Sequence, residues 1–120
     1  DYPYRGFGPN DKTLDLDPAC QPDFLQDARD PLPAGEWKAV LIDRPYTPED
    51  AARYMPGANK FPNVNDLLKR SIAVVDVGGK VGVLDYVWPQ PPKNAKEVAV
   101  VGVGTGRNNR ARWFTVFERL

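Results

Sequence analysis

The chain has 120 residues, which is the length of a single domain. Its 16 basic and 16 acidic residues cancel, so a polyanion would have to meet a local cluster of charge rather than a net field. The absence of histidine excludes Ser-His-Asp and Cys-His catalysis and every zinc site that uses histidine. Because Cys20 is the only cysteine, an intrachain disulfide and a cysteine metal cluster are also excluded, and we expect no bound metal.

The composition also bears on location. No apolar run approaches the ~20 residues of a membrane span, and no secretory signal is visible. A single free thiol suits a reducing compartment. We therefore expect a cytoplasmic protein that does not contact a membrane. The first residue is Asp1 and not methionine, which leaves room for an upstream segment.

Residues 1–12 are rich in glycine and proline, and we expect them to form an N-terminal arm ahead of one α/β domain over residues 13–120. Gly6 and Gly8 also have the spacing of a glycine-rich cofactor loop. However, no strand precedes them and no amphipathic helix follows them, so we favour the arm.

Three strands are predicted in the first half of the chain. Residues 13–17 alternate apolar and acidic side chains before a proline, and residues 24–28 form a second short strand. Residues 38–43 contain four consecutive apolar residues, which is typical of a strand covered on both faces. The intervals between these strands leave little room for crossover helices.

The second half of the chain begins with two predicted helices. Thr47 can cap a helix over residues 48–55, where a proline and two acids also favour a helix start. Asn63 can cap a second helix, whose apolar residues recur at helical spacing as far as Val75, with Gly78 and Gly79 ending it. Strands are predicted at residues 80–87, 97–102 and 112–117. This order predicts an α/β fold, the later part of a doubly wound, mostly parallel sheet that ends in an antiparallel C-terminal hairpin.

Several functional groups follow the central strand. Asp43 ends the apolar run, Pro45 lacks a ladder donor and holds Arg44 extended, and Tyr46 comes just before a helix start. In open α/β sheets, ligands bind outside the carboxyl ends of the strands. We therefore predict an active site at these residues. The alternative is that Asp43 caps the helix and Tyr46 is an aromatic residue at the rim.

The segment Asp43-Arg44-Pro45-Tyr46 resembles the Asp-Pro-Pro-Tyr motif that follows the fourth strand of the S-adenosylmethionine-dependent amino-group DNA methyltransferases. Other segments look like further parts of that family: residues 14–18 like the acidic end of its second strand, 26–33 like its third-strand motif, 65–84 like its helix and fifth strand, and 112–118 like its closing strand. The resemblance implies a Rossmann-like methyltransferase sheet that is truncated at its N-terminus.

The activity implied by the resemblance is methyl transfer from S-adenosylmethionine to the exocyclic amine of a base in DNA, adenine N6 ahead of cytosine N4. Asp43 and the backbone carbonyl of Arg44 would accept hydrogen bonds from the two N–H groups of the amine. Pro45 would hold these two acceptors in place. Tyr46 would stack on the base after it is flipped out of the duplex.

The same resemblance implies a cofactor site. Asp15 would bind the ribose hydroxyls of the cofactor, and Asp27 with Ala28 beside it would bind the adenine amino group. Ordinary strand-end and turn acids are the alternative interpretation.

A loop before the last strand carries groups suited to phosphates or a base edge: Arg107, Asn108, Asn109 and Arg110. A solvated hairpin loop is the alternative interpretation of these four residues.

The chain departs from the family in two respects. Arg44 stands where the first proline is expected, and the glycine-rich first-strand loop is not recognisable. A homodimer partner or an upstream segment would then have to complete the cofactor site. The alternative function is a catalytically inactive methyltransferase-like module that binds nucleic acid or assembles with partner chains. Methylation of RNA or of a protein glutamine follows the same motif logic.

Overall fold

The computed structural model describes residues 8–54, 61–104 and 111–120. The chain divides into two compact units, Asp1–Pro31 and Leu32–Leu120. Its secondary structure is mixed α/β and consists mostly of strands, which confirms the predicted α/β class at this level. The predicted arm of residues 1–12 lies largely outside the described residues, so the predicted boundary after residue 12 stays a prediction.

The first unit contains two short strands and a 3-10 helix: β1 (Leu14–Asp15), η1 (Pro18–Cys20) and β2 (Phe24–Leu25). The two strands pair in parallel. The Asp17 carboxylate caps η1 by accepting a hydrogen bond from the backbone N–H of Ala19 at 2.9 Å. The Asp23 carboxylate accepts one from the backbone N–H of Thr13 at 2.8 Å. Both predicted strands are present but shorter than predicted, and no α-helix crosses between them.

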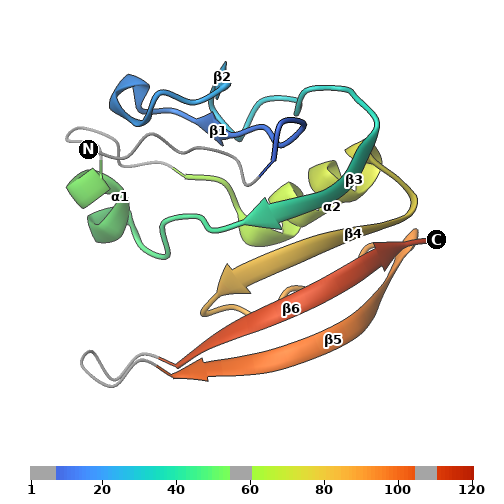
Figure 1. Cartoon of the computed structure of the whole chain (residues 1–120). Helices are drawn as coiled ribbons and strands as arrows, with labels where there is room; N and C mark the ends of the chain where they lie inside the picture. Colours follow the sequence, from blue (N-terminus) through green and yellow to red (C-terminus); the bar gives the residue numbers. More distant parts are fainter. Residues whose placement is uncertain (1–7, 55–60, 105–110) are drawn as a thin grey trace. The chain divides into compact units, whose positions relative to one another are not determined.

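The second unit contains a four-stranded sheet made of β3 (Trp37–Ile42), β4 (Val75–Asp85), β5 (Ala95–Gly104) and β6 (Ala111–Arg119). The strand order is β3-β4-β6-β5 (Figure 1). β3 and β4 are parallel, and β6 is antiparallel to both β4 and β5. β5 therefore runs in the same direction as β3 and β4. The chain returns to the start of β5 through residues 86–94, which contain three prolines.

The antiparallel C-terminal hairpin is confirmed, but the expectation of a mostly parallel sheet is wrong for this four-stranded sheet. Two of its three strand pairings are antiparallel. The cause is the position of the last strand. β6 lies between β4 and β5, which run in the same direction, and it is antiparallel to both. Direct pairing of β4 with β5 would have been parallel. The sequence pattern identifies the segments that form strands, but it does not identify the neighbours of each strand.

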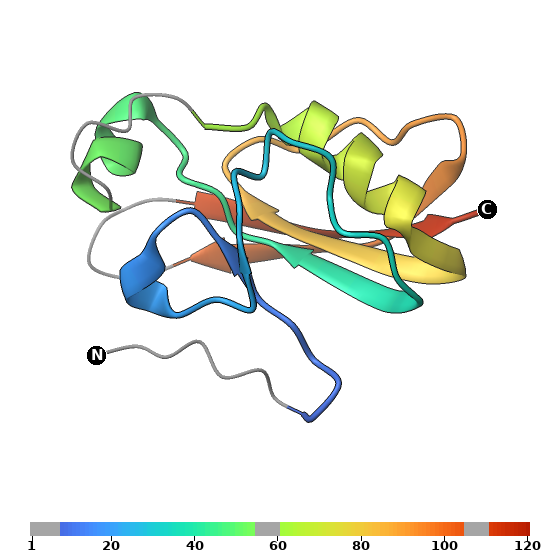
Figure 2. The same ribbon diagram turned by 90° about the horizontal axis from the view of Figure 1, so that it is seen from above.

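Two helices accompany this sheet, α1 (Pro48–Tyr54) and α2 (Val64–Val74). Their predicted starts are confirmed by the side chains that precede them. Thr47 Oγ1 accepts a hydrogen bond from the N–H of Asp50 at 3.1 Å. Asn63 Oδ1 accepts one from Asn65 at 2.9 Å and one from Asp66 at 3.2 Å. α2 packs against β4 and covers one face of the sheet (Figure 2).

α2 ends at Val74, before the predicted stop at Gly78 and Gly79, because the chain enters β4 at Val75. Gly78 and Gly79, which were expected to separate the helix from the strand, lie inside β4. They occupy an irregularity in its pairing with β3, between Trp37 and Ala39. Gly78 has φ +80°, and a Cβ atom at Gly79 would lie 2.7 Å from a backbone carbonyl oxygen. Two glycines therefore permit a bulge that other residues would strain.

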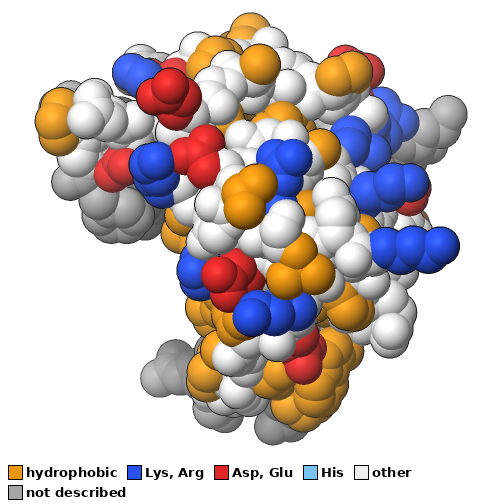
Figure 3. Space-filling model, turned by 90° about the vertical axis from the view of Figure 1, so that its right-hand side faces the viewer, with side chains coloured by type: hydrophobic (Ala, Val, Ile, Leu, Met, Phe, Trp, Pro, Cys, Tyr) orange, Lys and Arg blue, Asp and Glu red, His pale blue; other side chains and the backbone are white. Residues whose placement is uncertain are grey.

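The core of the second unit is built from residues of the sheet, of α2 and of α1. Its buried apolar residues are Ile42, Ala51, Val64, Leu67, Leu68, Ile72, Val75, Val81, Val83, Ala95 and Phe117. The opposite face of the sheet is less covered, since Leu41 is 73% exposed and Val101 is 53% exposed. On the side drawn in Figure 3, basic and acidic side chains are interspersed at the left and in the middle, basic side chains gather along the right-hand edge, and hydrophobic side chains gather toward the lower end.

Candidate active site

The predicted catalytic residues Asp43, Arg44, Pro45 and Tyr46 leave the C-terminal end of β3. Because β3 and β4 are parallel, their C-terminal ends lie side by side at one edge of the sheet. That edge is where open α/β sheets bind ligands. The Asp43 side chain is exposed there, whereas Tyr46 is half-buried.

Tyr46 connects the turn to its surroundings. Its hydroxyl donates a hydrogen bond to Asp43 Oδ1 at 3.1 Å. Its ring centroid lies 4.4 Å from that of Tyr86, with the ring planes tilted by 39°. The guanidinium carbon of Arg112 lies 5.4 Å from the same ring, within the range of a cation–π contact. Asp43 and Tyr46 are thus brought together. Tyr86, the residue after β4, and Arg112, in β6, contact the Tyr46 ring.

The protonation of Tyr46 follows from these contacts. Partial burial, and then the negative charge and hydrogen bond of Asp43, raises the pKa of Tyr46 to about 12, while Arg112 acts in the opposite direction. The phenol therefore remains a neutral donor at physiological pH. It can donate a hydrogen bond, but it is not suited to act as a general base at that pH.

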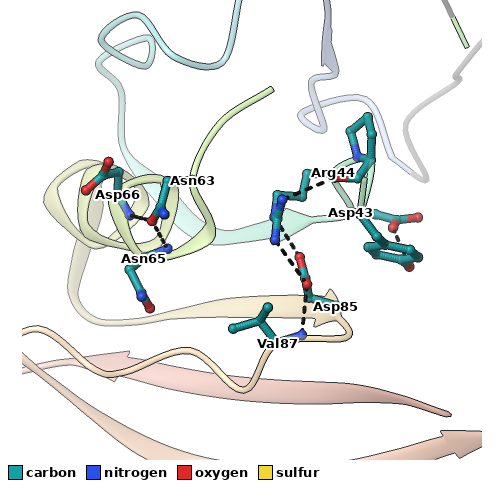
Figure 4. Close-up of polar contacts among 9 residues, drawn as sticks. Asp43, Arg44, Asn63, Asn65, Asp66, Asp85 and Val87 are labelled. Atoms are coloured by element: carbon teal, nitrogen blue, oxygen red, sulfur yellow. Dashed lines mark hydrogen bonds and ion pairs between the residues drawn. The ribbon is translucent and has the colours of Figure 1, made fainter. Parts of the chain in front are cut away.

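The Arg44 side chain forms a buried ion pair with Asp85, the last residue of β4 (Figure 4). Arg44 Nε lies 2.7 Å from Asp85 Oδ2, and Nη2 donates a hydrogen bond to Oδ1 at 3.2 Å. The two side chains are 8% and 1% exposed, respectively. The contact through Nε is an ion pair by distance and lacks the alignment of a hydrogen bond. Two parallel strand ends are therefore joined by paired charges.

Asp85 is the site residue that the sequence analysis missed. Residues 80–85 read as an apolar strand that ends in an acid, as residues 39–43 do, and this repeated pattern was the available signal. A buried carboxylate requires a charged or hydrogen-bonding partner. Arg44 is that partner.

The three predicted cofactor residues lie in the first unit. Asp15 ends β1, is half-buried, and accepts a hydrogen bond from the N–H of Asp17 at 2.9 Å. Asp27 follows β2 and binds Arg29, with Nη2 of Arg29 lying 2.6 Å from Oδ2. Ala28, the residue between Asp27 and Arg29, is half-buried. The Asp27 carboxylate is therefore already neutralised by an arginine.

The four predicted nucleic-acid contacts, Arg107, Asn108, Asn109 and Arg110, lie outside the described residues, so their role stays a prediction. Near the end of β4 and the start of β6, the rings of Trp88 and Trp113 lie 5.1 Å apart, and these residues are 46% and 36% exposed. Trp88 Nε1 donates a hydrogen bond to Glu97 Oε1 at 2.5 Å. This indole pair is the most exposed aromatic contact among the described residues.

Within residues 8–54, 61–104 and 111–120, no group of three or more cysteine, aspartate and glutamate side chains is arranged to hold a metal ion. In the same part of the chain, none of the helices is both long enough and apolar enough to cross a membrane.

Comparison with known proteins adds no family to this geometry. No protein-family model, curated protein or solved structure matches the chain. The functional assignment therefore depends on the residues and their arrangement.

Proposed function

We propose that the chain is a methyltransferase domain that transfers a methyl group from S-adenosylmethionine to the exocyclic amine of a base in DNA, with adenine N6 favoured over cytosine N4. One observation carries the proposal. An acid-Arg-Pro-aromatic turn leaves β3 at the carboxyl edge of a parallel strand pair, with the Asp43 carboxylate exposed and within hydrogen-bonding distance of the Tyr46 hydroxyl.

The chemistry of the amine explains why these groups are suitable. An exocyclic amine is a poor nucleophile because its lone pair is delocalised into the ring of the base. The Asp43 carboxylate and the Arg44 carbonyl oxygen accept hydrogen bonds from its two N–H groups. These two hydrogen bonds orient the amine so that its lone pair points toward the methyl group. Neither role requires histidine, which the chain lacks.

Tyr46 provides the stacking surface for the flipped base. In the structure its hydroxyl donates a hydrogen bond to Asp43 Oδ1, and its ring contacts the ring of Tyr86. The Asp43 carboxylate has further acceptor sites, so it can accept a hydrogen bond from the incoming amine as well as from the tyrosine hydroxyl. Stacking of the base on the Tyr46 ring competes with the contacts of Tyr86 and Arg112.

The cofactor supplies an activated methyl group on a sulfonium centre. The residues of the first unit suit its polar end: carboxylates accept from ribose hydroxyls and from the adenine amine, and Asp15 lies at the carboxyl end of the parallel strand β1. Asp27 can fill this role only if the adenine amine displaces Arg29 from its carboxylate.

The fold offers support at a coarser level. β3, β4 and β5 run in one direction, and a C-terminal hairpin inserts β6 antiparallel between β4 and β5. This agrees with the proposal that the chain corresponds to the later part of a doubly wound, Rossmann-like sheet. The equivalence to a methyltransferase sheet belongs to the same proposal.

The first test is calorimetric titration of S-adenosylmethionine into the 120-residue chain, with Asp27→Ala as the variant that removes the adenine acceptor. Saturable binding that weakens in Asp27→Ala supports the cofactor site. The absence of binding at millimolar cofactor would show that this chain alone is not an enzyme.

The second test is transfer of a labelled methyl group to DNA. We expect Asp43→Asn to lower kcat by about 100- to 1000-fold, because it removes a charged acceptor aimed at the reacting amine. Asp66→Asn is the matched control, since Asp66 is an exposed acid in the first turn of α2. Equal activity of the wild type and Asp43→Asn would contradict the catalytic role.

A non-catalytic module that binds nucleic acid or assembles with partner chains is the second candidate. The pairing of Asp27 with Arg29 favours it, because this acid would not then be available to the cofactor. Binding of DNA without binding of S-adenosylmethionine would select this function.

A further inference from the structure

The methyl-transfer chemistry uses the backbone carbonyl of Arg44 but gives no task to its side chain. That side chain lies in the interior, with 8% exposed, against an Asp85 side chain that is 1% exposed. Burying two charges carries a large desolvation cost, and a buried ion pair is often no more stable than apolar residues of similar volume. A contribution to stability therefore does not by itself account for the pair.

The pair connects three segments of the second unit. Asp85 Oδ1 also accepts a hydrogen bond from the N–H of Val87 at 2.9 Å, which holds the turn after β4 (Figure 4). Arg44 Nη1 donates one to the carbonyl oxygen of Pro45 at 3.2 Å, within the turn after β3. The guanidinium carbon of Arg44 lies 5.1 Å from the ring centroid of Phe61, which precedes α2.

We propose that the Arg44–Asp85 ion pair is a positioning device that holds the Asp43–Tyr46 turn at a defined place beside the end of β4. The related motif has a rigid proline at this position, and here a side chain fixed at its far end replaces the ring. Pro45 restricts the backbone of Arg44 from the other side. The effect of the Arg44–Asp85 pair on catalysis rests on the proposed methyl transfer, but its effect on the position of the turn does not.

The positioning is tested with the double variant Arg44→Met/Asp85→Leu, which replaces both charges by apolar side chains and leaves no unpaired buried charge. The readout is the backbone amide order parameter, measured by NMR at Asp43, Arg44 and Tyr46. We expect it to fall from the rigid range of about 0.85 to below about 0.6. A folded double variant with unchanged order parameters would overturn the proposal.

The control removes an ion pair that joins β3 and β4 themselves. Lys38 Nζ lies 2.6 Å from Asp76 Oδ2 near the opposite end of these strands, with Lys38 85% exposed. Lys38→Met/Asp76→Leu makes the same chemical change away from the site. We expect it to leave the order parameters of the turn unchanged, and equal loosening in both double variants would show that the Arg44–Asp85 pair is not specific to the turn.

The kinetic test follows where the wild type transfers methyl groups. We expect Arg44→Met/Asp85→Leu to lower kcat by about 100-fold, the effect of a small misplacement of reacting groups, with KM for DNA and cofactor nearly unchanged. A loosened turn with unchanged kcat would refute the catalytic part of the inference. Failure of the wild type to transfer methyl groups would refute the proposed function instead. The order parameters would still show whether the Arg44–Asp85 pair fixes the position of the turn.

Arg44→Lys keeps the inference testable if the double variant does not fold. Lysine retains the positive charge but cannot make two parallel contacts with a carboxylate. We expect it to fold, with a partial fall in the order parameters of the turn and a smaller loss of kcat. A lysine variant that matches the wild type in both measurements would overturn the role of the two-point contact.

Discussion

Asp43 and Asp85 stand at the ends of two parallel strands, but their carboxylates have different surroundings. Asp85 is enclosed and paired with Arg44, since an unpaired buried charge would be strongly unfavourable. Asp43 is exposed and contacts only a neutral donor, the hydroxyl of Tyr46, in the hydrogen bonds described for it. The two acids therefore differ in availability: Asp85 is held in a buried ion pair, and the Asp43 side chain is open to solvent.

Tyr46 gives a pH prediction at this scale. Its pKa is raised to about 12 by partial burial and by Asp43, above the value of about 10 in an unfolded chain. Between these two pH values the unfolded chain has lost the proton and the folded chain has kept it, so stability falls as pH rises from 10 to 12. Below pH 10 the contribution is fully present.

The measurement is ultraviolet titration of tyrosinate, with Tyr46→Phe as the comparison. We expect the variant to lack a tyrosine that titrates near pH 12, and its stability to fall less steeply over this pH range. Identical titration curves, apart from the loss of one tyrosine of ordinary pKa, would contradict the burial and hydrogen bonding assigned to Tyr46.

At the scale of elements, the helix starts are determined locally. The side chain of Asn63 accepts hydrogen bonds from two backbone N–H groups that have no partner within α2. The apolar face of α2 then buries Leu68 and Ile72 completely against the sheet. Capping and burial thus support the same helix from its end and from its side.

We expect Asn63→Ala to lower the free energy of unfolding by about 1 kcal/mol, because both N–H groups lose their acceptor. The measurement is urea denaturation, followed through the midpoint at constant slope. Lys69→Ala, on the exposed side of α2, is the matched control and should change stability by less than about 0.5 kcal/mol. An equal effect of the two substitutions would refute the capping role.

At the scale of the whole molecule, the hydrophobic core belongs to one unit. All the buried apolar residues among the described part of the chain lie between Ile42 and Phe117, and therefore within Leu32–Leu120. The first unit contributes two strands of two residues each and no buried apolar residue to that set. Burial of apolar surface is the dominant favourable term in folding, so the second unit contains most of what is needed to fold.

We therefore expect a chain of residues 32–120 to fold on its own, with a cooperative thermal transition and a β-rich circular dichroism spectrum. Cooperativity is expected because a single core connects α2 with the sheet. A truncated chain that is unfolded, or that unfolds gradually, would show that residues 1–31 are required for this core.

Much of the local structure was predictable because its signals are contiguous in sequence. Thr47 and Asn63 precede their helices directly, and the strands recur close to the predicted positions. The extent of β4 was not predictable, because Gly78 and Gly79 usually end an element. Here they allow the strand to begin five residues before its regular pairing with β3, at Val75 rather than Lys80.

The sequence by itself determined the helix starts, the chemistry that the absence of histidine excludes, and the turn that carries Asp43 and Tyr46. Each of these depends on composition or on residues within a few positions of one another. The tertiary structure alone decided that β6 lies between β4 and β5 and that Arg44 meets Asp85, 41 residues away. Strand order and buried charge pairs arise from contacts between distant segments, and the interior imposes them because every buried backbone group and charge must find a partner there.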